Sequence, residues 1–262
     1  MPLNPKITDW RGKRVWLLGA SSGIGAALAQ RLAGQGAWVA ISARRPGALD
    51  ELLAELPGIG HLALPCDAAD AESMQAACAR IEAAWGGLDL AIYLAGNYVP
   101  LHATDFSPQQ VRDLCEVNYL GAVSFTHAAL PLLRQAPGAA GMVLVASVAG
   151  YRGLPKALGY GPAKAALIHF TETLYLDLHP QGMGVWLVNP GFVATRLTAQ
   201  NDFHMPALIS PEVAAEAMLA GLASGRFDIH FPKRFTRFMK FLRLLPYRCY
   251  FALVGRTVPH ES

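Results

Sequence analysis

This chain of 262 residues is short of charge and of cysteine. Lys, Arg, Asp and Glu make up only 16% of the residues, whereas 53% are hydrophobic. The four cysteines are scattered without a C-x-x-C pair, and the histidines show no metal-ligand spacing. The sequence therefore points to neither a zinc site nor a disulfide framework, so we expect no metal and a reducing compartment.

The chain also has no recognisable secretory signal, internal repeat or long low-complexity segment. Lys6 interrupts the N-terminal segment before any long apolar stretch forms, so we expect a cytoplasmic protein. Its net charge of +3 is modest, which argues against nucleic-acid binding. The length fits one α/β domain.

Short apolar runs alternate with helix-like stretches through residue 231. Strands buried on both faces of a parallel sheet have such apolar runs, and the helices between them cover its faces. We expect seven strands, at Val15–Leu18, Trp38–Ser42, Leu62–Pro65, Leu88–Leu94, Met142–Ala146, Val185–Val188 and Phe227–Phe231. We expect helices at Gly25–Gly34, Leu49–Leu56, Ala71–Trp85, Pro108–Arg134, Ala157–His179 and Pro211–Ala223.

A glycine-rich turn joins the first expected strand to the first expected helix. Its sequence is Gly19-Ala20-Ser21-Ser22-Gly23-Ile24-Gly25, a Gly-x-x-x-Gly-x-Gly spacing. Glycine permits a tight turn and a close approach of the backbone to a ligand, and a helix N-terminus offers N–H donors to a phosphate. The turn therefore indicates a nucleotide site.

A second group of residues, Ser147, Tyr160 and Lys164, lies further along the chain. A spacing of four places Tyr160 and Lys164 on one face of a helix. A neighbouring ammonium favours the phenolate, so we expect Lys164 to lower the pKa of Tyr160 and allow acid–base chemistry. The alternative is an ordinary exposed helical pair beside a serine at a strand end.

Together, the glycine spacing and a serine thirteen residues before Tyr160 resemble the short-chain dehydrogenase/reductase family of the classical type. The resemblance extends to about Phe231. It implies a single Rossmann-type, doubly wound parallel sheet of about seven strands with helices on both faces. We expect residues 1–231 to form this domain and residues 232–262 to be a C-terminal extension of it.

The resemblance implies four catalytic residues. Tyr160 would be the proton donor to a carbonyl, Ser147 would hold the carbonyl oxygen, and Lys164 would activate Tyr160 and bind the nicotinamide ribose. Asn118, in Val-Asn-Tyr-Leu-Gly, matches the asparagine that anchors a water on the proton relay.

The resemblance also implies a set of cofactor-binding residues. They are Gly19, Ser21, Ser22, Gly23, Ile24, Gly25, Asp67, Ala95, Gly96, Asn118, Tyr160, Lys164, Pro190, Gly191, Val193 and Thr195. Asp67 would face the adenine ring, although an aspartate there is often a local cap, and Asp70 is the better N-cap for the next helix. Two departures from the family pattern are Leu18, where threonine is usual, and Tyr93-Leu94, where two asparagines are usual.

The end of the second expected strand favours NADP(H) over NAD(H). An acidic residue there would bind the ribose hydroxyls of NAD, but this chain has Ala43, followed by Arg44 and Arg45. A guanidinium can bind a phosphate through two charge-assisted hydrogen bonds. We therefore expect Arg44 to be the main contact to the extra phosphate and Arg45 a weaker one; the alternative is that both are solvated.

The expected reaction is hydride transfer to or from an apolar ketone or secondary alcohol, with a lipid-derived compound as one candidate. By resemblance, three segments close the substrate pocket, at 97–103, 150–155 and 192–206. Their side chains are mostly apolar: Tyr98, Val99, Leu101, Tyr151, Leu154, Phe192, Leu197, Phe203 and Met205, with Arg152, Arg196 and Asp202 as the charges. Two alternatives stay open, an NAD-linked dehydrogenase and a catalytically silent NADP-binding scaffold or sensor. Family habit implies a homodimer or homotetramer through the helices at Pro108–Arg134 and Ala157–His179.

The C-terminal segment has a different character, with no acidic residue between Asp228 and Glu261. Its basic residues recur at helical spacing: Lys233, Arg234, Arg237, Lys240 and Arg243. An apolar stripe is interleaved with them: Phe235, Phe238, Met239, Leu242 and Leu245. Pro246 should end this helix, and a second short one should follow. Such a pattern is typical of a helix in a membrane interface, although the stripe could instead pack on the protein itself or on another subunit.

Overall fold

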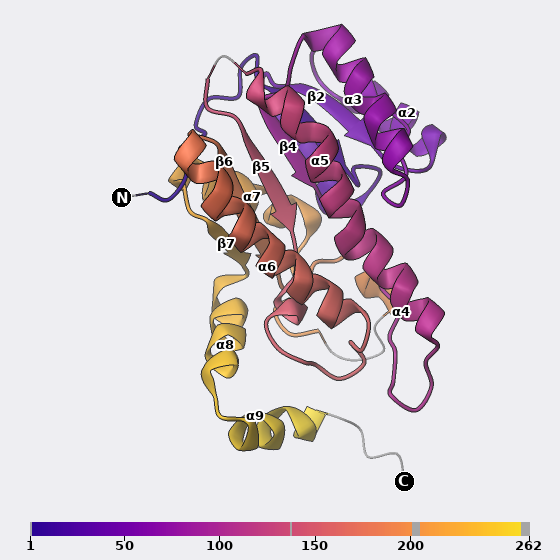
Figure 1. The fold of residues 1–262 in the computed structure, drawn as a ribbon, viewed down its shortest axis with the longest axis vertical. Coiled ribbons are helices and arrows are strands. Elements are labelled where there is room, and N and C mark those ends of the chain that lie inside the picture. The colour runs from indigo at the N-terminus through magenta and orange to yellow at the C-terminus, as the bar shows by residue number, and fades with distance from the viewer. Residues whose placement is uncertain (1, 137, 201–204, 258–262) are drawn as a thin grey trace.

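The computed structural model describes residues 2–136, 138–200 and 205–257. Seven parallel strands form one sheet in the order β3-β2-β1-β4-β5-β6-β7 (Figure 1). The strands are β1 Arg14–Leu18, β2 Trp38–Ser42, β3 Leu62–Ala63, β4 Leu90–Tyr93, β5 Gly141–Val145, β6 Gly184–Pro190 and β7 Asp228–Phe231. The order reverses between β1 and β4, which is where open α/β sheets bind ligands, beyond the carboxyl ends of the strands. The expected doubly wound sheet is confirmed.

Helices cover both faces of the sheet (Figure 1). One buried cluster joins the sheet to α1 Gly23–Gly34, α2 Pro46–Glu55 and α7 Pro211–Ser224. The opposite cluster joins it to α3 Ala71–Trp85, α5 Gly121–Arg134 and α6 Tyr160–Leu178. Alternate residues of β1 enter the two clusters, Val15 one and Trp16 the other, as the two-residue period of a strand requires. Short 3-10 turns lie at Val148–Gly150, His179–Gln181, Thr198–Gln200 and Gly255–Thr257.

The helix expected at Pro108–Arg134 is interrupted in its middle. The structure has α4 Pro108–Cys115, a π-helical turn Glu116–Leu120 and then α5. The Tyr93 hydroxyl donates a hydrogen bond to the carbonyl of Val117 in this turn, at 2.5 Å. A β-carbon at Gly121 would lie only 2.2 Å from the Ala68 carbonyl oxygen, so glycine is needed for this close approach. The departure at Tyr93 therefore supports the turn that carries Asn118.

The C-terminal tail, α8 Lys233–Leu244 and α9 Tyr247–Val254, follows β7 directly (Figure 1). The two helices meet at Pro246, as expected. Met239, Leu242 and Tyr250 are buried in the same core cluster as α5 and α6, so much of the expected apolar stripe packs on the protein itself. Phe238 is an exception, with 54% of its surface exposed. Within the described ranges, no helix combines the length and the apolar character needed to cross a bilayer.

Candidate active site

The glycine turn after β1 is shaped by contacts that no larger residue allows. Gly19 has a φ of +101°, and a β-carbon there would lie 2.5 Å from the Ala95 nitrogen. A β-carbon at Gly25 would lie 2.3 Å from the Gly19 carbonyl oxygen. Ser22, the N-cap of α1, forms no side-chain capping bond with a described residue. The first N–H groups of α1 therefore stay available to a ligand.

A cavity of about 330 Å³ opens at this turn, beyond the carboxyl ends of β1, β2 and β4. Twelve of the expected cofactor residues line it: Gly19, Ser21, Ser22, Gly23, Ile24, Gly25, Arg44, Arg45, Asp67, Ala95, Gly96 and Thr195. Ten further residues line the cavity and were not among the expected cofactor contacts: Leu18, Ala43, Cys66, Ala68, Leu94, Asn97, Val117, Val145, Arg196 and Leu197. Most of these directly neighbour an assigned residue, because the strand ends converge here.

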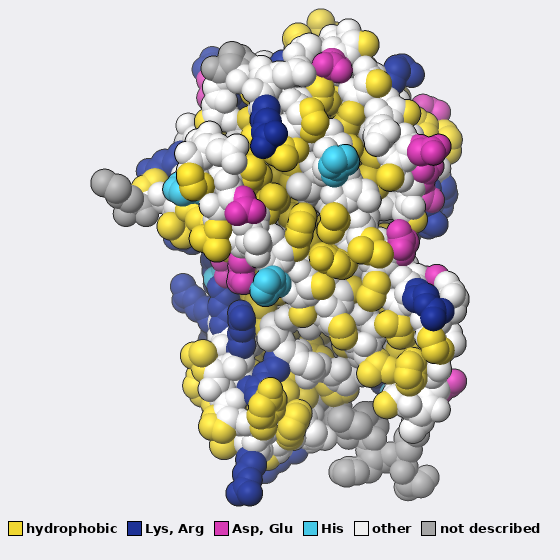
Figure 2. Space-filling view, viewed as in Figure 1, with side chains coloured by type: hydrophobic (Ala, Val, Ile, Leu, Met, Phe, Trp, Pro, Cys, Tyr) yellow, Lys and Arg dark blue, Asp and Glu magenta, His cyan; other side chains and the backbone are white. Residues whose placement is uncertain are grey.

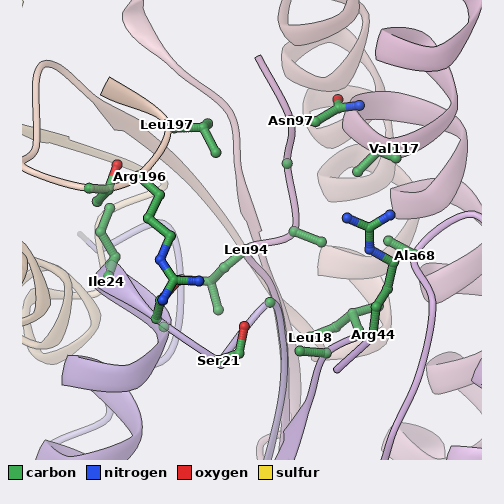
Figure 3. A pocket seen from close by; sticks show the side chains of 18 of the residues that line it. Leu18, Ser21, Ile24, Arg44, Ala68, Leu94, Asn97, Val117, Arg196 and Leu197 are labelled. Carbon is green, nitrogen blue, oxygen red and sulfur yellow. The ribbon is translucent and has the colours of Figure 1, made fainter. Parts of the chain in front are cut away.

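Arginines enter this cavity from opposite sides. Figure 3 shows Arg44, from the end of β2, facing Arg196, with Leu94 between them. Arg196 follows Thr195, whose methyl carbon would lie 2.9 Å from a β-carbon at Gly23. Guanidinium groups combined with a helix N-terminus bind phosphates well. The cavity therefore fits a phosphate-rich nucleotide.

Other expected cofactor residues lie elsewhere or have a local role. The Asp67 carboxylate accepts a hydrogen bond from the Ala69 N–H at 3.0 Å, so Asp67 caps a local turn as well as lining the cavity. Asp70 caps α3, as expected. Pro190, Gly191 and Val193 are absent from the cavity lining. A β-carbon at Gly191 would lie 2.8 Å from the ring of Phe235 in the tail. Their contact with a cofactor stays a prediction.

The structure brings Ser147, Tyr160 and Lys164 together. Ser147 follows β5, Tyr160 is the first residue of α6, and Lys164 lies one turn later. The Ser147 side chain lies near enough to the Tyr160 phenol to influence its pKa. The ring of Tyr98 packs edge-on against that of Tyr160, with 5.2 Å between the ring centroids.

Burial controls the proton affinities of this group. It raises the pKa of Tyr160 to about 12, although the neighbouring Ser147 side chain lowers this pKa in part. It lowers the pKa of Lys164 to about 7. The expectation that Lys164 lowers the pKa of Tyr160 is therefore wrong for this geometry, because desolvation dominates and makes the ammonium itself less stable.

Lys164 and Asn118 connect the catalytic group to the cavity. The Lys164 ammonium donates to the carbonyl of Val145, a lining residue, at 3.0 Å. A β-carbon at Gly96, also in the lining, would lie 3.0 Å from Asn118 Oδ1 and 3.7 Å from Lys164 Nζ. Asn118 is fully buried and donates through Nδ2 to the Asn97 carbonyl at 2.8 Å. Its Oδ1 has no hydrogen-bond partner among the described residues.

Comparison with known proteins agrees with this geometry. The family model described as short chain dehydrogenase matches residues 13–205. This protein belongs to the short-chain dehydrogenase family. An uncharacterized oxidoreductase of Myxococcus xanthus is 34% identical over 230 residues, which cover 87% of this chain and 90% of that protein. An uncharacterized oxidoreductase of Staphylococcus aureus is 30% identical over 205 residues, or 78% of this chain and 88% of its own length.

A solved structure also has the fold of this short-chain dehydrogenase. The crystal structure of a short chain dehydrogenase from Burkholderia cenocepacia, in complex with NADP, superposes with a TM-score of 0.80. It is 24% identical, and the match covers 96% of this chain and 100% of that one. This similarity supports the overall architecture of the sheet and its helices.

Proposed function

We propose that this short-chain dehydrogenase is an NADP(H)-dependent oxidoreductase acting on an apolar ketone or secondary alcohol. The observation that carries the proposal is the position of Arg44 in the cavity lining, at the end of β2, where Ala43 stands in place of an acidic residue. An arginine there suits the additional phosphate of NADP, whereas NAD favours a carboxylate. The related fold that binds NADP supports the same choice.

The cavity residues would hold the cofactor by different means. The N–H groups at the start of α1 would bind phosphate, Arg44 the additional ribose phosphate with a weaker contribution from Arg45, and Arg196 a phosphate on the opposite wall. Asp67 and Ala68 would lie against the adenine. The bound nicotinamide supplies or accepts hydride, and the protein supplies position and proton.

Tyr160 would handle the proton of the substrate oxygen. With a pKa of about 12 it is protonated at neutral pH, which suits proton donation to an oxygen that gains negative charge during reduction. Ser147, whose side chain lies beside Tyr160, would hold the same oxygen. Lys164, with a pKa of about 7, can release and accept a proton near neutral pH, and together with Asn118 it would return a proton to the site.

An apolar substrate is supported by the positions of the charged side chains on the three segments expected to close the substrate pocket, 97–103, 150–155 and 192–206, called here the lid segments. Arg152 is bound to the C-terminal tail, and Arg196 lines the nucleotide cavity. Asp202 and Phe203, also expected near the substrate, lie outside the described residues. In the described part of these segments, the side chain that contacts Tyr160 is therefore a ring, that of Tyr98, and not a charged group.

Assembly and location stay predictions. We propose a homodimer or homotetramer through α4, α5 and α6, located in the cytoplasm and without nucleic acid. Light scattering of the purified protein tests the assembly. Peripheral association of residues 232–262 with a membrane is also proposed, and it depends on which faces of α8 and α9 are exposed.

Fluorescence titration with NADPH and NADH tests the cofactor assignment without a known substrate. Wild type should bind NADPH more tightly. Arg44→Ala should weaken NADPH binding by about 10- to 100-fold, as expected for a lost charge-assisted contact, and leave NADH binding nearly unchanged. Arg45→Ala should have a smaller effect, and Arg80→Ala, on the exposed surface of α3, should have none.

Three results would redirect the assignment. Equal binding of both cofactors by wild type would favour the NAD-linked dehydrogenase. A preference for NADPH that survives in Arg44→Ala would show that Arg44 is not the main contact to the additional phosphate. Tight NADPH binding with no turnover in a broad screen of ketones and alcohols would favour the silent scaffold.

A further inference from the structure

The outer face of the C-terminal tail is unusually apolar for an exposed surface. Leu244 is 82% exposed and Tyr247 69% exposed, and neither belongs to the stripe that packs on the core. The large exposed apolar side chains of this outer face are Phe238, Phe241, Leu244, Tyr247, Phe251 and Leu253. In the space-filling view, yellow side chains lie beside dark blue ones at the end of the molecule formed by α8 and α9 (Figure 2).

All the charges on the outer face have one sign. Its exposed charged residues are Arg234, Arg237, Arg243, Arg248 and Arg256. None of them forms an ion pair with an acidic side chain in the described part of the chain. Lys240, in contrast, forms an ion pair with Asp228. The outer face is therefore a cationic surface with aromatic and aliphatic groups between its charges.

The inner face of the tail is fixed to the loop between Ser147 and Tyr160. The Arg152 guanidinium donates to the carbonyls of Leu242 and Leu245, at 3.0 and 2.6 Å. It also lies 4.1 Å from the ring centroid of Tyr250, whose hydroxyl donates to the Gly153 carbonyl at 2.5 Å.

A second contact joins the tail to another lid segment. The rings of Phe192 and Phe235 lie with their centroids 5.4 Å apart. The tail thus contacts two of the three segments expected to close the substrate pocket. A partner bound to the outer face would therefore lie near the segments expected to close the substrate pocket.

We propose that the outer face of α8 and α9 docks on an anionic lipid bilayer and presents the substrate pocket to compounds dissolved in that bilayer. Arginines attract acidic lipid headgroups, while Phe and Tyr side chains enter the interfacial region. A second copy of this chain fits less well. A two-fold symmetric contact would set the same arginines against each other with no acidic residue between them.

The substrate part of this inference rests on the proposed function and narrows it. The substrate class becomes a long-chain or polycyclic ketone or secondary alcohol that partitions into membranes. A bilayer-bound enzyme meets such a compound at high local concentration, whereas a short, water-soluble ketone gains nothing from docking.

Vesicle flotation of the full chain tests the docking. Wild type should float with vesicles of phosphatidylcholine and phosphatidylserine, remain unbound with phosphatidylcholine alone, and be released by high salt. An Arg234→Gln/Arg237→Gln variant should bind about 25-fold more weakly, at about fivefold for each arginine. A Phe241→Ser/Phe251→Ser variant should also lose binding. Ile59→Ser, which changes an apolar residue that is 87% exposed elsewhere, is the matched control and should bind as wild type does.

Several results would overturn the docking. Failure of wild type to float with anionic vesicles would do so, as would equal binding by the double variants. Sedimentation that showed self-association through this face, lost in Phe241→Ser/Phe251→Ser and without vesicle binding, would assign the face to a second copy.

NADPH titration and turnover separate this inference from the proposed function. The tail variants should bind NADPH and reduce a water-soluble ketone as wild type does, and lose only turnover of a vesicle-dissolved ketone. Equal loss with both ketones would overturn the link between docking and substrate. Flotation by a wild-type protein that binds no NADPH would instead overturn the proposed function and leave the docking intact.

Discussion

The nucleotide cavity meets the catalytic group at Lys164, and the C-terminal tail contacts the loop between Ser147 and Tyr160, but the two regions are built in opposite ways. The cavity is shaped mainly by backbone, with glycines packed so closely that a β-carbon at Gly25 would overlap its neighbour. The tail is held by a few side chains, above all Arg152, and leaves large apolar groups exposed. Chemistry and cofactor binding should therefore depend on residues around the cavity, and membrane contact on residues of the tail.

The largest expected effect separates chemistry from both binding surfaces. Tyr160→Phe removes the proton donor, and general acid catalysis typically contributes about 10²- to 10⁴-fold. We expect kcat to fall by about that factor, with NADPH affinity and vesicle binding unchanged. Steady-state kinetics, cofactor titration and flotation of the same preparation measure the three properties. Turnover within tenfold of wild type would contradict the assignment of Tyr160.

The residues around the nucleotide cavity were largely predictable from the sequence, because their geometry depends on residues that are close together in the chain. A glycine turn between a strand and a helix, and two residues four apart on a helix, have nearly the same geometry wherever they occur. The proton affinities were not predictable in this way. The high pKa of Tyr160 reflects its burial by distant segments, including the one that carries Tyr98, and spacing along the chain does not reveal that burial.

The next prediction tests whether the cavity depends on its backbone shape. Gly25→Ala would place a methyl group 2.3 Å from the Gly19 carbonyl oxygen, so the turn must shift. We expect a loss of about 2–4 kcal/mol in the free energy of unfolding and at least tenfold weaker NADPH binding. Denaturant unfolding and cofactor titration measure these losses, while flotation should be unchanged.

A second glycine serves as the control. Gly47→Ala, in α2, meets no atom within 4 Å and should be neutral or slightly stabilising. If both substitutions behaved alike, close packing at the glycine turn would not explain the need for Gly25.

Arg152→Ala should affect the tail side. It removes two short hydrogen bonds to carbonyls at the end of α8 and the contacts with the rings of Tyr247 and Tyr250. Hydrogen bonds to a charged group are typically worth about 1.5–3 kcal/mol, so we expect a loss of about 2–3 kcal/mol in stability. The KM for an apolar ketone should rise while NADPH affinity is retained.

Limited proteolysis provides a second measurement of this effect. Arg152→Ala should speed tryptic cleavage within 232–257, whereas Arg243→Ala, with an exposed side chain, should not change the free energy of unfolding. Loss of NADPH affinity in Arg152→Ala would show that the two regions are not independent.

For the C-terminal tail, the sequence predicted the helices but not which of their side chains are exposed. Its two helices and the break at Pro246 follow from local spacing and were predicted. Which apolar side chains are buried depends on partners far away in the chain: Arg152 and Gly153 bind the tail through Leu245 and Tyr250. The face that packs on the core therefore contains most of the expected apolar stripe. The apolar residues of the exposed face could be identified only from the structure.

The smallest expected effect concerns the buried ammonium of Lys164. Its pKa of about 7 in the folded protein lies below the ordinary value of 10.5, because burial disfavours the charged form. Between these two values the unfolded state binds more protons, so the contribution of Lys164 to stability rises with pH. Relative to Lys164→Met, wild type should gain about 2 kcal/mol in the free energy of unfolding between pH 7 and pH 9, and little between pH 5 and pH 6. Denaturant unfolding at each pH measures this difference. The opposite slope would mean that the folded protein stabilises the ammonium, and Lys164 could then lower the pKa of Tyr160 as the helical spacing first indicated.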